Sequence, residues 1–266
     1  MHKNMQSLSV AFLALFLTQL MTDFLLRGDQ VLVEKRRGTL RAYLSHGGVH
    51  FVAGAALLGL CGSFAWLGNK AWALVLVLTL VHLAIDWANL KLQASHRISD
   101  TARTFAIDQL LHTLTIGVGV WWVSGTPMGS LMLALHQLQP RVESTLVLLV
   151  VYIGVIFGGG HLIRYLTKPL FKHDLTITGE TVNELQDAGL YIGWLERFLV
   201  LTALLLRSPA MIGLILAAKS IIRFPELKSV RFAEYFLLGT LLSLSLALVG
   251  GLILLQALYG QITVSR

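Results

Sequence analysis

The chain alternates between long apolar runs and short polar segments from end to end. A helix needs about 20 apolar residues to cross the hydrocarbon core of a membrane, and several runs reach that length. They predict eight spans, at residues 7–26, 43–66, 71–90, 105–123, 143–166, 190–206, 209–222 and 233–258. The expected fold is therefore an all-α, polytopic transmembrane helical bundle.

The sixth and seventh runs are shorter than the others, and only the link Arg207-Ser208-Pro209 joins them. We expect either two short spans or a short, tilted hairpin here. A polar segment separates both runs from the earlier part of the chain. This pattern predicts a five-span part at residues 1–172, a short cytoplasmic segment at 173–189 and a three-span part at 190–266.

Composition supports the membrane class, since hydrophobic residues make up 55% of the chain and charged residues only 13%. A soluble domain carries about 25% charged residues. The single cysteine, Cys61, excludes an internal disulfide and a cysteine-based metal site. We interpret the first run as a span rather than a cleaved signal peptide, because Thr22 and Asp23 stand where a cleavage region needs small neutral residues.

The net charge of +7 is explained by membrane topology. Fourteen of the 21 Lys and Arg residues fall in segments 27–42, 91–104, 164–189 and 223–232, and five fall on the opposite side. Positive residues concentrate in the cytoplasmic loops of membrane proteins. The bias predicts that these four segments face the cytoplasm and that the partners are membrane lipids rather than nucleic acids.

Ionisable residues recur inside the first four apolar runs, although a charged group at the centre of a bilayer costs about 2.5–3.5 kcal/mol on insertion scales. Three of these runs carry a pair at spacing i, i+4, which places both side chains on one helix face. Given the predicted span directions, all of them lie in the cytoplasmic half of the membrane. The residues are Asp23, His46, His50, His82, Asp86, Asp108 and His112.

Four imidazoles and three carboxylates at one depth predict a divalent-metal site. Seven groups are enough for one ion or for two ions bridged by a carboxylate, and zinc or manganese suits these nitrogen and oxygen ligands. Such an ion activates water for hydrolysis. Asp23, Asp108 and, from a later span, Glu196 are the candidate catalytic carboxylates. A metal-free proton or ion relay and structural hydrogen bonding stay open as alternatives.

The later spans carry a second set of charged residues near the predicted cytoplasmic interface. Arg164 ends the fifth span, Glu196 lies in the sixth, and Lys219 and Arg223 are spaced i, i+4 in the seventh. One interpretation is a membrane anchor at Arg164 and an ion pair from Glu196 to Lys219 or Arg223. In the other, Arg164, Lys219 and Arg223 bind an anionic head group or phosphoester substrate beside the metal.

Seven motifs spread over residues 18–245 together resemble the bacterial membrane proteins of the domain of unknown function 3307 family. They are TDFLLR, H-x-x-x-H, HLAID, DQLLH, GWLERF, AAKSIIRF and EYFLLGTLLS. The resemblance implies a location in the bacterial inner membrane without naming a reaction. The first half is more distantly similar to the YdjM-type inner-membrane metal-dependent hydrolases.

Together these patterns favour a metal-dependent hydrolase of a phosphoester or lipid-like substrate. The alternatives are a proton- or metal-ion-coupled transporter and a membrane-embedded sensor or interaction subunit with a structural metal. An oligomer is compatible with all three, and fold-level likeness does not choose among them.

Overall fold

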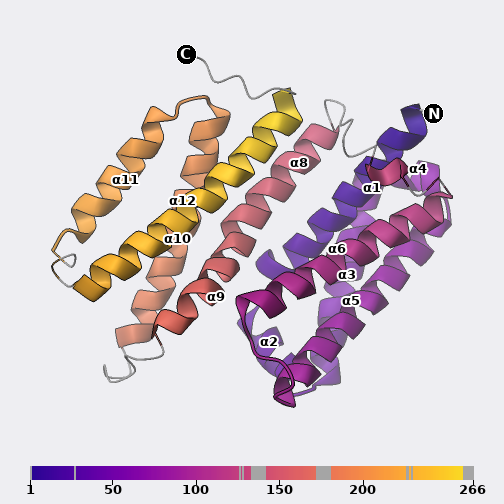
Figure 1. Ribbon diagram of the computed structural model, residues 1–266. Helices are drawn as coiled ribbons and strands as arrows, with labels where there is room; N and C mark the ends of the chain where they lie inside the picture. Colours follow the sequence, from indigo (N-terminus) through magenta and orange to yellow (C-terminus); the bar gives the residue numbers. More distant parts are fainter. Residues whose placement is uncertain are drawn as a thin grey trace. The chain divides into compact units, whose positions relative to one another are not determined.

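The computed structural model describes residues 2–26, 28–125, 127, 129–132, 142–171, 181–225, 228 and 230–259. All the regular elements within these ranges are helices (Figure 1). The chain divides into two compact units, residues 1–150 and 151–266. Of the predicted cytoplasmic segment 173–189, residues 173–180 lie outside the described ranges and the rest begin a long helix, so the three-part division stays a prediction.

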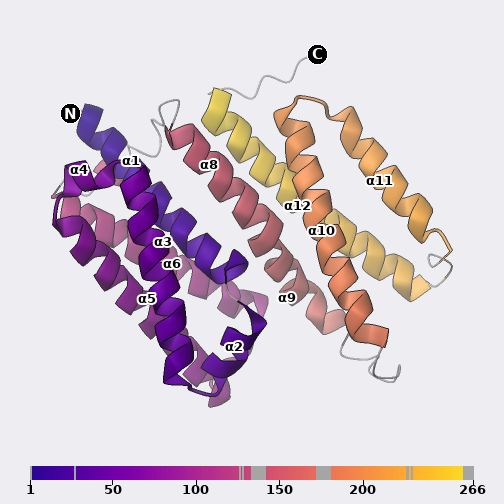
Figure 2. The same ribbon diagram turned by 180° about the vertical axis from the view of Figure 1, so that it is seen from behind.

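Four long helices make up the first unit and pack in a ring, α1 on α3, α3 on α5, α5 on α6 and α6 on α1. They are α1 (His2–Leu20), which the π-helical turn η1 (Met21–Leu25) continues, α3 (Leu40–Leu60), α5 (Lys70–Ala94) and α6 (Ala102–Ser124). Two short helices connect them, α2 (Asp29–Arg36) and α4 (Ser63–Leu67). Helix α2 packs on α3 and α5, near the end of α1 (Figure 2).

Local signals in the sequence set the boundaries of α6. The Thr101 side chain accepts a hydrogen bond from the backbone N–H of Thr104, and the Thr104 side chain accepts one from the backbone of Thr101. This capping box satisfies two of the N–H groups that a helix start leaves unpaired. Gly125 ends the helix at φ +64°, a left-handed conformation that glycine adopts without steric cost.

Polar side chains fill the inside of the first unit, and large apolar side chains cover its outside. The residues at most 4% exposed include Asp23, His46, His50, His82 and His112. By contrast, Leu44, Leu80 and Leu110 are each more than half exposed. Lipid is a favourable surrounding for such an outer surface, and buried ionisable groups in a membrane helix bundle normally face its interior.

The second unit contains α10 (Thr181–Leu205), α11 (Ala210–Arg223) and α12 (Val230–Tyr259). The π-helical turn η2 (Gly154–Gly158) and α9 (Gly159–Phe171) precede α10 in the same unit, and α8 (Val142–Ile153) precedes η2 in the chain. Helices α9, α10 and α12 pack on one another, and α11 packs on α10. These helices are pink to yellow in Figure 1.

Five helical segments are long and apolar enough to cross a membrane, namely Ser7–Leu25, Leu40–Leu60, Lys70–Ala94, Val142–Thr167 and Phe236–Tyr259. They match the first, second, third, fifth and eighth predicted spans, which supports the membrane class. The helices throughout the described residues confirm the all-α fold. The other three predicted spans fall on α6, α10 and α11. Helix α6 carries two charged and several polar residues, α10 carries four charged residues, and α11 has only 14 residues, so the total of eight is not confirmed.

Candidate metal centre

Asp23 enters the centre of the first unit from the π-helical turn η1. Single π-helical turns interrupt the regular α-helical ladder and occur frequently at functional sites. Gln19, one turn earlier, donates from Nε2 to Asp23 Oδ2 at 2.6 Å. The other oxygen, Asp23 Oδ1, is buried and has no hydrogen-bond partner among the described residues, so it is the atom left to bind something else.

His46 of α3 and His82 of α5 face each other at close range, with their Nε2 atoms 2.9 Å apart. The two helices approach closely here because the residue after His46 is Gly47. A Cβ atom at Gly47 would lie 2.7 Å from Leu83 Cδ1, well inside a normal contact. Small residues at helix contacts allow such an approach in membrane bundles, and this one brings the two imidazoles together.

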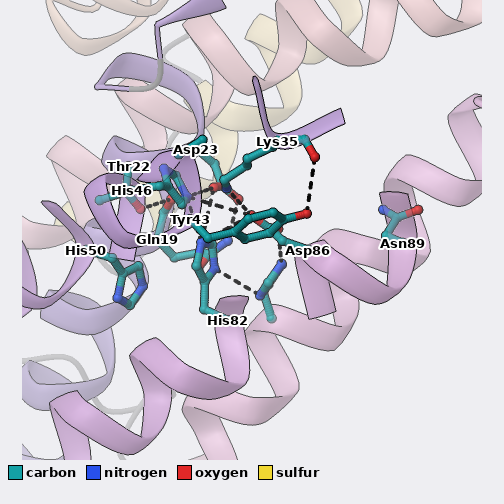
Figure 3. A network of polar contacts seen from close by, with 12 residues as sticks. Gln19, Thr22, Asp23, Lys35, Tyr43, His46, His50, His82, Asp86 and Asn89 are labelled. Carbon is teal, nitrogen blue, oxygen red and sulfur yellow. Dashed lines mark hydrogen bonds and ion pairs between the residues drawn. The ribbon is translucent and has the colours of Figure 1, made fainter. Parts of the chain in front are cut away.

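Asp86, one turn after His82 on α5, completes a group of four potential ligands with Asp23, His46 and His82. Asp23 Oδ1 lies 3.6 Å from His46 Nε2 and 3.7 Å from His82 Nε2. Asp86 Oδ2 lies 3.7 Å from each of the same two nitrogens (Figure 3). Ligand atoms around a tetrahedral ion at about 2.1 Å lie roughly 3.4 Å apart, so the spacing fits one divalent ion.

A second group shares Asp86 and adds Asp108 and His112 of α6. His112 Nε2 lies 3.5 Å from Asp86 Oδ1 and 3.9 Å from Asp108 Oδ1. On the other side of the ring, His112 Nδ1 is 3.3 Å from His82 Nδ1. His112 therefore bridges the two groups through both of its nitrogens.

His50 lies beside the cluster and belongs to neither group of potential ligands. Its Nδ1 is 3.0 Å from the hydroxyl of Thr79, and its ring stacks on that of His82 with the centroids 4.5 Å apart. Six of the seven residues predicted as ligands thus fall into the two groups, and His50 packs against one of them. The prediction that His50 binds metal stays untested.

Three residues of the site were not singled out from the sequence. Lys35 of α2 is buried and reaches Asp86 Oδ2 with its Nζ at 2.5 Å. Asn89 donates from Nδ2 to Asp108 Oδ1 at 2.9 Å, and Gln19 holds Asp23. Asn89 and Gln19 were recognisable, because each stands three or four residues from another polar site residue on its helix. Lys35 carries no such signal.

The charged residues predicted in the later spans belong to the second unit. Lys219 Nζ lies 2.7 Å from Glu196 Oε2, which confirms the predicted ion pair. Arg164 is exposed on α9, as a membrane anchor would be. The role of Glu196 in catalysis and of Arg164, Lys219 and Arg223 in anion binding stays a prediction.

A buried arginine in the second unit was also not among the residues predicted from the sequence to have a role. Arg197 of α10 donates from Nε and Nη2 to the carbonyl oxygen of Ile156, at 3.1 and 2.7 Å, and from Nη1 to the Ser243 hydroxyl at 3.3 Å. Ile156 lies in η2, and Gly160 leaves room for the guanidinium, since a Cβ there would be 3.0 Å from Nη2. Arg197 thus ties three helices of the unit together.

The fold and the site define an all-helical membrane protein with buried histidine and aspartate groups that can hold a divalent metal ion. A family model described as "Protein of unknown function (DUF3307)" matches residues 11–142, and through this region the chain belongs to that family. The match includes every residue of the two ligand groups and ends before the motifs GWLERF, AAKSIIRF and EYFLLGTLLS. No curated protein and no solved structure matches the chain. The resemblance to YdjM-type hydrolases stays an expectation.

Proposed function

We propose that this protein is a metal-dependent hydrolase of the bacterial inner membrane that cleaves a phosphoester or lipid-like substrate. The observation that carries the proposal is the group Asp23, His46, His82 and Asp86, whose four ligand atoms lie within 4.8 Å of one another. Two neutral imidazoles and two carboxylates form a donor set that suits zinc or manganese. Its burial among apolar helices favours function over chance, because ionisable groups inside a membrane are costly.

The positions of the protons on His82 and His112 favour a single ion. A neutral histidine that binds metal through Nε2 carries its proton on Nδ1, and His82 Nδ1 faces His112 Nδ1 at 3.3 Å. His82 therefore donates to His112, whose own proton must then sit on Nε2, the atom facing Asp86 and Asp108. His112 becomes a residue that orients His82 and Asp86, as partners of metal ligands commonly do.

Asp108 is the carboxylate that this assignment leaves outside the ligand set. It is only partly exposed, and Asn89 donates a hydrogen bond to it. A divalent ion supplies Lewis acidity and lowers the pKa of a bound water to about 7. Asp108 would serve as the general base for a water bound to such an ion, and His112, whose Nε2 lies 3.9 Å from Asp108 Oδ1, would help to position Asp108.

A topology of eight spans with the site in the cytoplasmic half accompanies the proposal. Helix α6, which carries Asp108 and His112, exposes large apolar side chains on its outer face, among them Ile107, Leu114, Val118 and Trp122. A row of this kind favours contact with lipid. The positive bias of the predicted loops favours a cytoplasmic opening, which suits a substrate from the inner leaflet or the cytosol.

Metal analysis of the purified full chain tests the proposal. After reconstitution with zinc or manganese, the wild type should hold one ion per chain, and Asp86→Asn should hold none. Hydrolysis of phosphoester lipids by the loaded wild type and not by Asp108→Asn would then support the enzyme. A wild type that binds neither ion overturns it. Bound metal without hydrolysis would select the sensor, and metal or proton uptake into liposomes would select the transporter.

A further inference from the structure

Lys35 is the one residue of α2 whose side chain is buried, among those whose exposure the structure describes. Its neighbours Val33, Glu34 and Arg36 are exposed, whereas Lys35 is only 2% exposed. Lysine is almost never fully buried without a partner. Here the partner is Asp86, with Nζ 2.5 Å from Oδ2, and Nζ also lies 5.6 Å from the centroid of the Tyr43 ring (Figure 3).

The same atom, Asp86 Oδ2, also belongs to the candidate ligand set. If a divalent ion is bound, the carboxylates of Asp23 and Asp86 neutralise its two charges. The ammonium of Lys35 and the ion then both contact Asp86 Oδ2, so two positive centres lie on either side of one oxygen. A ligand with a negatively charged oxygen that contacts both the ion and the ammonium is favoured at this place.

A pocket lies beside the end of α2. It has a volume of about 450 Å³, and its polar lining residues are Arg36, Gln93, His96, Ser99 and Asp100. This is within the usual range of about 300–1,000 Å³ for ligand sites. Gln93 donates to Asn89 at 2.9 Å and Asn89 donates to Asp108, so polar side chains lead from the pocket to the cluster.

We propose that Lys35 is the substrate-binding residue of this protein and that it pairs with a phosphoryl group. A phosphoryl oxyanion matches a compact ammonium charge next to a divalent ion. Arg36, next to Lys35 in the chain, lines the neighbouring pocket and adds a second positive charge on this side of the cluster. The inference rests on the proposed function, since it requires the metal at Asp23, His46, His82 and Asp86.

Inorganic phosphate is the probe, and the protein is the full chain loaded with Co²⁺, whose visible spectrum reports on its surroundings. Phosphate should change the spectrum of the wild type. Lys35→Met should keep its metal but bind phosphate about 30-fold more weakly or worse, the typical loss for one member of a buried charge pair. Lys35→Gln keeps a hydrogen-bond donor for Asp86 without the charge and should show the same loss if Lys35→Met does not fold.

Lys91→Met is the matched control, because Lys91 is exposed on α5 and its Nζ lies over the ring of Trp87 at 4.5 Å rather than in the cluster. It should bind phosphate as the wild type does. Equal phosphate affinity in the Lys35 variants and the wild type overturns the inference, as does a loaded wild type that ignores phosphate. A wild type that binds no metal would instead contradict the proposed function.

The source of the phosphoryl group is read from a second arm. Nanodiscs of neutral lipid are compared with nanodiscs that contain phosphatidic acid, in the absence of free phosphate. A Lys35-dependent spectral change with phosphatidic acid assigns a lipid head group. A change that only free phosphate produces assigns a soluble phosphoester.

Discussion

His46 Nε2 and His82 Nε2 lie 2.9 Å apart, although 36 residues separate them in the chain. In the absence of metal one of these nitrogens must donate to the other, because two unprotonated nitrogens would repel. With an ion bound, both Nε2 atoms must be unprotonated, so each ring would carry its proton on Nδ1. Metal binding and the tautomers of the two rings are therefore coupled, and both rings should act as ligands.

Alanine at His46 or at His82 should remove the ion from the purified protein, with a loss in affinity of more than about 100-fold, since ligands matter at least as much as the partners that orient them. Metal content per folded chain measures this. His50→Ala is the control, because His50 bonds to Thr79 and lies outside the ligand groups. It should retain one ion per chain, and its loss of metal would restore the seven-residue ligand set.

His112 should behave as an orienting residue and Asp108 as a general base, and neither as a metal ligand. His112→Ala should lower metal affinity by about 10–100-fold while one ion still binds at saturation. Asp108→Asn should leave stoichiometry at one and abolish hydrolysis. Isothermal titration calorimetry with zinc measures both the affinity and the number of ions bound per chain. A wild type with two ions, reduced to one by Asp108→Asn, would show instead that Asp86 bridges a pair.

Chelation should destabilise the protein, because an ion that binds only the folded state adds about 2.7 kcal/mol at a concentration 100 times its dissociation constant. Asp23 and Asp86 lie close to the same two nitrogens, so an ion there would stabilise these two buried carboxylates most. Thermal unfolding in detergent should show a higher Tm with zinc than with a chelator. Asp86→Asn should lose this difference, and a wild-type Tm indifferent to zinc would contradict the site.

The i, i+4 pairs made the candidate ligands recognisable from sequence, since His82 with Asp86 and Asp108 with His112 do share helix faces. Lys35 was not recognisable, because a lysine in a charged segment between two spans looks like an ordinary cytoplasmic residue. Its burial depends on α2 folding back onto α3 and α5, a long-range packing event. The position of His50 also depends on long-range packing, because the residue of α5 that it contacts is Thr79 rather than a carboxylate or an imidazole nitrogen of a ligand group.

The contact between Gly47 and Leu83 should control how close the two imidazoles come. Gly47→Ala places a methyl group 2.7 Å from Leu83 Cδ1, which forces α3 and α5 apart or Leu83 aside. Overpacking of this kind costs about 1–3 kcal/mol, and metal affinity should fall with it. Leu83→Ala in the same chain makes room again and should restore metal binding. A Gly47→Ala variant with wild-type affinity would show that Leu83 moves freely.

Arg197 should stabilise the second unit through the carbonyl of Ile156, which receives two of its N–H groups. Arg197→Met leaves that buried carbonyl without these donors, and an unsatisfied buried polar group costs about 1–3 kcal/mol. Denaturant titration of the reconstituted protein should show the loss, while Arg164→Met, at an exposed site on α9, should stay within about 0.5 kcal/mol of wild type. Metal content should be unchanged in both, because the ligand groups belong to the first unit. If Arg197→Met were as stable as the wild type, the two hydrogen bonds would do no more than offset the cost of burying the guanidinium charge.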